Sequence, residues 1–121
     1  DSGKVVLVRR DTGEKTAVAA EAALETVKSL LGEIQKNLYE RAKKFREENT
    51  RTIDQYGELK DFFDGRGGFA LSHWCGSAEC ETAVKNDTRA TIRVLQDEQS
   101  QGTCIVCGNP GRFQAVFAKA Y

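Results

Sequence analysis

The sequence predicts an α+β protein, in which a strand hairpin and one long helix precede a two-layer module with the element order β-α-β-α-β-β. Three observations lead to this prediction. Apolar residues recur at helical spacing, without a proline, from about residue 19 to residue 49. Short, alternating strand-like and helix-like segments follow. All four cysteines fall in this second part, in two close pairs that are typical of a metal site.

The first segment predicts a hairpin. An apolar, largely β-branched run (VVLV) predicts a strand over residues 4–10, and the turn-like composition of residues 11–14 ends it. Residues 15–18 are expected to return as a second short strand. Arg9 and Arg10, at the end of the first strand, suit either contact with RNA or a solvated strand end.

One long helix is predicted over residues 19–49. Its apolar residues recur at spacings of three and four, which puts them on one face: Leu24, Val27, Leu31, Ile34, Leu38, Ala42 and Phe45. At 1.5 Å per residue this helix is about 45 Å long, too long for one small core, so we expect it to span two packed units. The basic residues near its end suit a nucleic-acid backbone or a solvated face, and interleaved glutamates favour the solvated face.

The pattern changes near residue 50, which predicts a domain boundary between residues 1–49 and 50–121. The elements expected after it are a strand at 50–54, an amphipathic helix at 55–64, a glycine-rich loop at 65–68, a buried strand at 69–74, a helix at 78–87 capped by Ser77, a strand at 90–95, a polar loop at 96–103 and a strand at 112–118. A core of this size is small, and such domains commonly add a metal.

The cysteines have the spacing of a tetrahedral thiolate site. Cys75 and Cys80 form a C-x4-C pair, and Cys104 and Cys107 form a C-x2-C pair. Each pair supplies two sulfurs, and the loop between the pairs brings them together. Gly108 suits the positive φ that such a turn demands. We predict a structural zinc, because four thiolates leave no open position for water or substrate.

Other interpretations of these residues fit less well. Two disulfides are the main alternative, but the chain has no signal-like apolar segment and is not disulfide-dense. The start of a thioredoxin-type motif is present at Trp74-Cys75-Gly76, but the next cysteine comes five positions on instead of three. His73, the only histidine, is either a further ligand or hydrogen-bond donor for the site, or an ordinary strand-end residue.

The composition gives little support for a membrane role or for RNA binding through bulk charge. Lys plus Arg and Asp plus Glu each number 18, so the formal net charge is zero. No apolar run approaches the ~20 residues that a membrane helix needs. Because the chain has no methionine and begins directly on a strand-like run, we expect it to be a fragment of a longer polypeptide.

Several collinear stretches resemble one family. They are VRRDTGEK (8–15), EIQKNLYERA (33–42), FREENT (45–50), HWCG (73–76) with the Glu79-Cys80 pair, ATIR (90–93), CIVCG (104–108) and FAKAY (117–121). Together they resemble the C-terminal region of prolyl-tRNA synthetases of the archaeal/eukaryote-like type. The resemblance covers essentially the whole chain.

This resemblance implies a domain assignment and a metal. Residues 1–49 would be the end of a class II anticodon-binding domain with its connecting helix, and residues 50–121 the zinc-binding C-terminal domain. Tyr121 would pack back toward the catalytic domain. One structural zinc would be bound by Cys75, Cys80, Cys104 and Cys107.

The resemblance also implies the function of a parent enzyme. That enzyme activates proline with ATP and transfers it to the 3′ end of tRNA(Pro), in the cytoplasm and as a homodimer. Its ATP and proline sites lie in a catalytic domain that this chain lacks, so we expect the fragment to be inactive and to brace the anticodon-binding and catalytic domains. The rival functions are a stand-alone zinc-ribbon adaptor that binds RNA or protein, and a thiol oxidoreductase.

Overall fold

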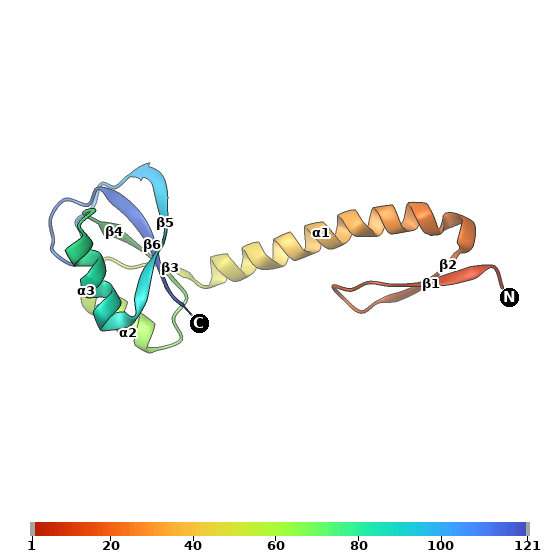
Figure 1. Cartoon of the computed structure of the whole chain (residues 1–121), viewed down its shortest axis with the longest axis horizontal. Coiled ribbons are helices and arrows are strands. Elements are labelled where there is room, and N and C mark those ends of the chain that lie inside the picture. The colour runs from red at the N-terminus through yellow and green to blue at the C-terminus, as the bar shows by residue number, and fades with distance from the viewer. Residues whose placement is uncertain (1, 121) are drawn as a thin grey trace. The chain divides into compact units, whose positions relative to one another are not determined.

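The computed structural model describes residues 2–120, apart from the side chains of Asp97 and Glu98. Tyr121, for which the resemblance implies a role, lies outside the described residues. The elements follow the predicted α+β order (Figure 1): β1 (Lys4–Val8), β2 (Lys15–Ala19), a 3-10 turn η1 (Ala20–Ala22), α1 (Ala23–Glu48), β3 (Thr50–Thr52), α2 (Tyr56–Asp64), β4 (Phe69–Trp74), α3 (Ala78–Thr88), β5 (Ala90–Gln99) and β6 (Phe113–Lys119).

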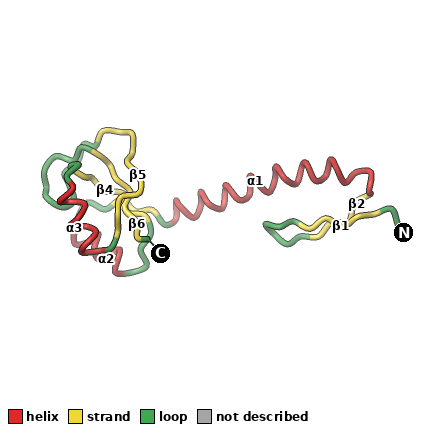
Figure 2. The backbone as a smooth tube through the Cα atoms, in the orientation of Figure 1, coloured by secondary structure: helices red, strands yellow, loops and turns green. Residues whose placement is uncertain are grey.

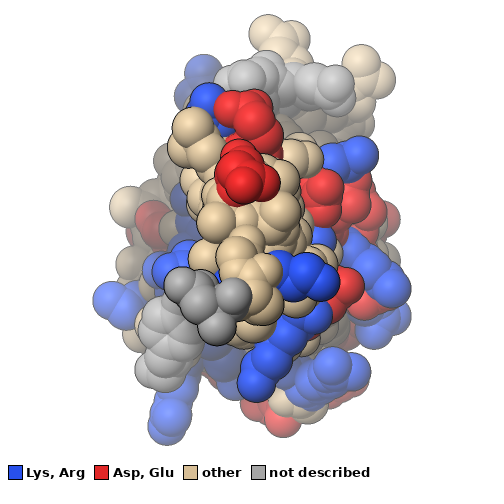
Figure 3. Space-filling model, turned by 90° about the vertical axis from the view of Figure 1, so that its right-hand side faces the viewer, with Lys and Arg blue, Asp and Glu red and all other residues tan. Residues whose placement is uncertain are grey.

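The chain divides into two compact units, Asp1–Phe45 and Arg46–Tyr121. In the first unit β1 and β2 pair antiparallel, with Lys4 opposite Ala19 and Val8 opposite Lys15. The hairpin runs back beside α1 (Figure 2). Charges of both signs are interspersed with uncharged surface over the face that Figure 3 shows.

A polar network fastens the hairpin turn to α1. The Arg9 guanidinium donates two hydrogen bonds to the Asp11 carboxylate, at 3.1 and 3.0 Å, and a third to Glu33 Oε2 at 2.9 Å. Asn37 Nδ2 donates to Asp11 Oδ2 at 2.6 Å. The hydrogen bonds from Arg9 and then from Asn37 hold the pKa of Asp11 well below its ordinary value. The Arg9 side chain is 17 % exposed and is paired within this unit, whereas Arg10 beside it is exposed.

The second unit is built on a four-stranded sheet in the order β3-β4-β6-β5. β3 runs parallel to β4, whereas β4 and β5 each pair antiparallel with β6. A parallel pair needs a crossover connection, which α2 supplies between β3 and β4. α3 connects β4 to β5 in the same way, across β6.

The core lies between the sheet and these two helices. Leu59 and Phe63 of α2 and Val84 of α3 form one buried cluster with Ala70 and Phe117 of the sheet. Both helices therefore cover the same sheet face, which is the predicted two-layer arrangement (Figure 1). Along β4 alternate residues are buried and partly exposed, so every second side chain points to the opposite face.

One expectation needs correction, and one predicted feature proves to be exposed. β5 extends to Gln99, with irregular pairing between Leu95 and Gln99, so the loop predicted from residue 96 begins later. The apolar stripe of α1 is not buried among the described residues: Leu24, Leu31 and Phe45 are 61–64 % exposed. Helical periodicity predicts that one face is apolar, but it does not say what packs against that face.

Within residues 2–120, no helix combines the length and the apolar character needed to cross a lipid bilayer.

Candidate metal centre

The four cysteines come together at one end of the second unit. Their sulfur atoms all lie within 4.8 Å of one another, and none is in a disulfide. Cys75 Sγ is 3.7 Å from Cys80 Sγ and 3.8 Å from Cys107 Sγ. A tetrahedral zinc site with Zn–S bonds of about 2.3 Å places its sulfurs about 3.8 Å apart. The structure therefore gathers all the predicted ligands in an arrangement that could hold a metal ion, and the disulfide alternative is wrong.

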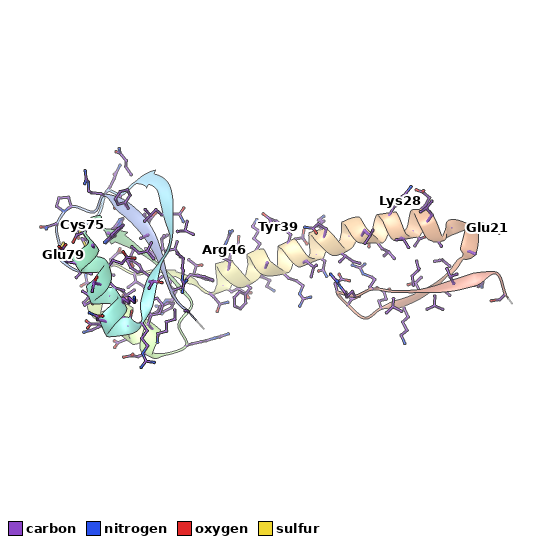
Figure 4. The ribbon with its side chains drawn as sticks, in the orientation of Figure 1. Glu21, Lys28, Tyr39, Arg46, Cys75 and Glu79 are labelled. Atoms are coloured by element: carbon purple, nitrogen blue, oxygen red, sulfur yellow. The ribbon has the colours of Figure 1, made fainter. Side chains whose placement is uncertain are left out.

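The first pair of cysteines is positioned by a turn from a strand into a helix. Cys75 directly follows β4, and Gly76 adopts a φ of +91° that turns the chain toward α3. Ser77 caps α3, because its Oγ accepts hydrogen bonds from the backbone N–H groups of Glu79 and Cys80. Figure 4 labels Cys75, just before this helix, and Glu79 in its first turn. The cap thus fixes Cys80 in the first turn, as the sequence predicts.

The second pair is held by a tight backbone turn. The N–H of Gly108 donates to the carbonyl of Cys104 at 2.9 Å, and Gly108 adopts the predicted positive φ, +73°. Cys104 N–H donates to Asn109 O at 2.7 Å, and Ile105 N–H donates to His73 O at 2.9 Å. The last bond ties this turn to β4, so the main chain brings the two pairs together.

The surroundings of the thiols differ. Burial, with neighbouring thiols, raises the pKa of Cys80 to about 12. Burial also acts to raise the pKa of Cys104, but backbone N–H groups of Cys107, Val106 and Cys75 outweigh it and lower that pKa to about 7. Four sulfurs at this separation cannot all ionise without a cation, since like charges disfavour one another. A divalent cation among the sulfurs offsets much of this repulsion, so the donor set fits such an ion.

His73 is a packing residue and not a fifth ligand. Its Nδ1 hydrogen-bonds Ser100 Oγ, and its Nε2 lies 4.0 Å from Asp54 Oδ1. A Cβ added at Gly102 would lie 2.2 Å from the His73 ring, so that glycine makes room for the imidazole. Of the two interpretations offered above, the structure favours the strand-end residue. The role of Gly102 was missed, since a lone glycine in a polar segment predicts only a loop.

A mixed sheet covered on one face by two helices, with four thiols gathered where a strand meets a helix, defines a small α+β domain with a cysteine cluster that could hold a metal ion. The family model described as "Prolyl-tRNA synthetase, C-terminal" matches residues 56–121, more than half of the 121 residues. The chain belongs to this family.

Individual relatives extend the match to the whole chain. The proline–tRNA ligase of Rubrobacter xylanophilus is 45 % identical over 121 residues, which are 100 % of this chain and 25 % of that protein. That of Chlorobium phaeobacteroides is 42 % identical over 130 residues, 99 % of this chain and 27 % of the relative. The chain therefore spans about a quarter of the length of the curated relatives it matches.

A solved structure agrees in fold. The crystal structure of prolyl-tRNA synthetase from Cryptosporidium parvum, complexed with halofuginone and AMPPNP, matches with a TM-score of 0.80 over 99 % of this chain and 26 % of that chain. The sequence identity is 21 %, so this likeness shows the fold alone. The resemblance to prolyl-tRNA synthetases drawn from the sequence is confirmed by the family model and the relatives.

Proposed function

We propose that this chain is the C-terminal part of a proline–tRNA ligase, a class II aminoacyl-tRNA synthetase. The parent enzyme activates proline with ATP and joins it to the 3′ end of tRNA(Pro). The observation that carries this proposal is the 45 % identity to a proline–tRNA ligase over all 121 residues. The ATP and proline sites belong to the part of the parent outside this chain, so the chain alone does not charge tRNA.

The metal in this proposal is one zinc ion, held by Cys75, Cys80, Cys104 and Cys107. Four thiolates complete the tetrahedron, so the ion is structural and takes no part in the reaction. When bound, it offsets part of the negative charge of the thiolates and joins the turn after β4 to the second cysteine pair. A domain this small gains much of its stability from such an ion, since apparent zinc-binding free energies reach ~10–16 kcal/mol in small finger peptides.

In the parent, residues 1–49 complete an anticodon-binding domain and provide its connecting helix, and residues 50–121 form the zinc-binding domain. The exposed apolar side chains of β1 and α1, such as Val6 and Leu31, are then covered by the rest of that domain. The chain braces the anticodon-binding and catalytic domains at a fixed spacing, which matters because small misplacements of reacting groups cost rate steeply. The parent works in the cytoplasm as a homodimer, an assignment that rests on the likeness alone.

Two measurements test this proposal. Elemental analysis of the purified chain is expected to give about one zinc per chain. In a charging assay the parent polypeptide is expected to join proline to tRNA(Pro), and the 121-residue chain is expected to join none. A parent that charges tRNA with a different amino acid, or not at all, refutes the enzymatic proposal. A chain that folds fully without metal refutes the structural role of zinc.

A further inference from the structure

The sheet of the second unit has one face that α2 and α3 leave uncovered. A trough of ≈ 470 Å³ lies on it, with an apolar floor formed by Phe69, Leu71, Val94 and Val116. Arg46 and Arg93 also line the trough. The trough thus combines four apolar side chains with two arginines, on the side of the sheet away from the buried core.

The floor is continuous across three strands. Leu71 of β4 pairs with Val116 of β6, and Val116 pairs with Val94 of β5. Side chains that lie opposite each other on adjacent strands point to the same face and touch. Val94 is 55 % exposed although it is aliphatic. Leu71 and Val116 are partly exposed. A strip of neighbouring aliphatic groups that solvent can reach is typical of a surface that another protein covers.

The charges on the two sides of this unit differ. Among the described side chains that line the trough, arginine is the only charged type. The helices on the opposite side carry several carboxylates: Glu58 and Asp61 in α2, and Glu79, Glu81 and Asp87 in α3. Arginine beside apolar side chains is a composition in which protein interfaces are enriched. Carboxylates on the partner complement the arginines.

The partner is expected to bind the face of the sheet and not to extend it by a further strand. β5 is the long edge strand, and its pairing with β6 is interrupted between Ile92 and Val94 and again between Leu95 and Gln99. Such irregularities and an exposed arginine on an edge strand discourage strand addition.

We propose that this face, which we call the open sheet face, is a docking surface for a protein segment that presents aliphatic side chains flanked by carboxylates. The segment comes from the portion of the parent polypeptide outside this chain, so the inference rests on the proposed function. The relatives are about four times as long as this chain, which leaves ample polypeptide to supply it. RNA fits less well, because bases stack on aromatic rings and Phe69 is the one aromatic residue among the described side chains that line the trough.

Hydrogen exchange followed by mass spectrometry tests this inference. Backbone amides of residues 91–96 and 114–118 are expected to exchange at least tenfold more slowly in the parent polypeptide than in the 121-residue chain. Arg93→Glu and Val94→Asp, each made in the parent, are expected to remove that protection. Both residues are exposed, so the fold is expected to survive. Lys85→Glu on the exposed side of α3 is the charge-matched control and should leave the protection unchanged.

Each alternative occupant has a distinct result that overturns the inference. Equal exchange in the two proteins, or added protection on α2 and α3 only, places the docking surface elsewhere. Protection that appears only when tRNA is added identifies RNA as the occupant. Protection in the isolated chain that rises with its concentration identifies a second copy.

The charging assay is a separate readout. A parent that charges tRNA(Pro) but in which β5 is not protected from exchange refutes the docking surface alone. A parent in which β5 is protected from exchange but which does not charge tRNA(Pro) refutes the enzymatic proposal alone.

Discussion

The four cysteines differ in their burial and in their backbone hydrogen bonds, although their spacing in the sequence makes them look equivalent. Cys80 and Cys104 are both buried, at 7 % and 2 % exposed. Burial raises the pKa of Cys80, whereas N–H groups aimed at Cys104 lower its pKa. The fold thus favours the thiolate form of Cys104, which is the form that binds a metal.

Cys104→Ser is expected to abolish zinc binding. The serine hydroxyl remains protonated near neutral pH and is a poor zinc ligand, so the zinc content should fall from about one per chain to nearly none. Loss of the metal should also unfold the sheet of the second unit, and circular dichroism measures the resulting loss of strand signal. Ser29→Ala, on an exposed position of α1, is the control and should keep its zinc. A serine variant that retains a full equivalent of zinc would show that Cys104 is not a ligand.

Ser77→Ala is expected to destabilise the second unit by about 1 kcal/mol, because α3 loses the side chain that caps its N-terminus. The same change frees the turn that holds Cys80, so zinc affinity should fall as well. Chemical denaturation of the zinc-loaded chain measures the first effect, and competition with a chelator measures the second. Ser29→Ala again serves as the control, with a change under about 0.5 kcal/mol. Equal stability of the two alanine variants contradicts the capping role.

Asp11 makes the contact between the hairpin and α1 sensitive to acid. Its folded pKa lies below the ordinary value of 3.8, because Arg9 and then Asn37 hydrogen-bond the carboxylate. A lowered folded pKa contributes stability that is present above the unfolded value and is lost as the pH falls toward the folded one. The contact should therefore weaken as the pH falls below 3.8.

The local readout is an NMR titration of the Asp11 carboxyl and the Asn37 side-chain amide. A local probe is needed because acid also removes zinc from thiolates. Asp11→Asn should abolish the pH-dependent change at Asn37. A carboxyl that titrates at its ordinary value would contradict the proposed network.

At the scale of elements, the sequence predicts most of the second unit because local rules agree there. Ser77 before an apolar helix, Gly108 after a C-x2-C pair and the apolar run of β4 each point to the structure that forms. β5 is predicted too short, since the residues after Leu95 are polar and look like a loop. One strand face and the outer edge of β5 meet solvent, so polar residues are compatible with pairing there. The strand propensities of the residues alone therefore do not predict that this segment pairs with β6.

The clustering of the four cysteines is predictable from their spacing, but the contacts that hold the cluster in place are not. The C-x4-C and C-x2-C pairs identify all four sulfurs that the structure brings together. The bond from Ile105 N–H to His73 O and the close packing of Gly102 on the His73 ring are tertiary contacts. Residues 29 or more positions apart meet in these contacts, and no local pattern encodes that meeting.

Two glycine substitutions separate helix propensity from close packing. Gly32→Ala in α1 adds a Cβ into open space, so it should stabilise the helix by up to about 1 kcal/mol. Gly102→Ala places a Cβ against the His73 ring and should destabilise the second unit by about 1–3 kcal/mol. Helix content and thermal melting of the zinc-loaded chain measure both. A neutral Gly102→Ala would mean that the ring moves aside freely.

At the scale of the whole molecule, burial is distributed unevenly between the two units. Among the described residues, the fully buried apolar side chains lie between Ile53 and Ala118, and α1 contains none. The first unit relies on a hairpin, one helix and the Arg9–Asp11 network. A single helix gains most of its stability from tertiary packing of its apolar face, and in this unit that face is exposed. The two units are therefore expected to differ in their ability to fold alone.

Residues 46–121, produced separately with zinc, are expected to unfold in one cooperative transition, because the buried core and the four thiols all lie within them. Residues 1–45 alone are expected to show partial helix and no cooperative melt. Circular dichroism melts of both pieces, with and without a chelator, make the comparison. The chelator should abolish the transition of residues 46–121 and leave the signal of residues 1–45 unchanged. A cooperative melt of residues 1–45 would mean that the hairpin and α1 stabilise each other without further packing, and the exposed apolar stripe would then need no cover from the rest of the parent polypeptide.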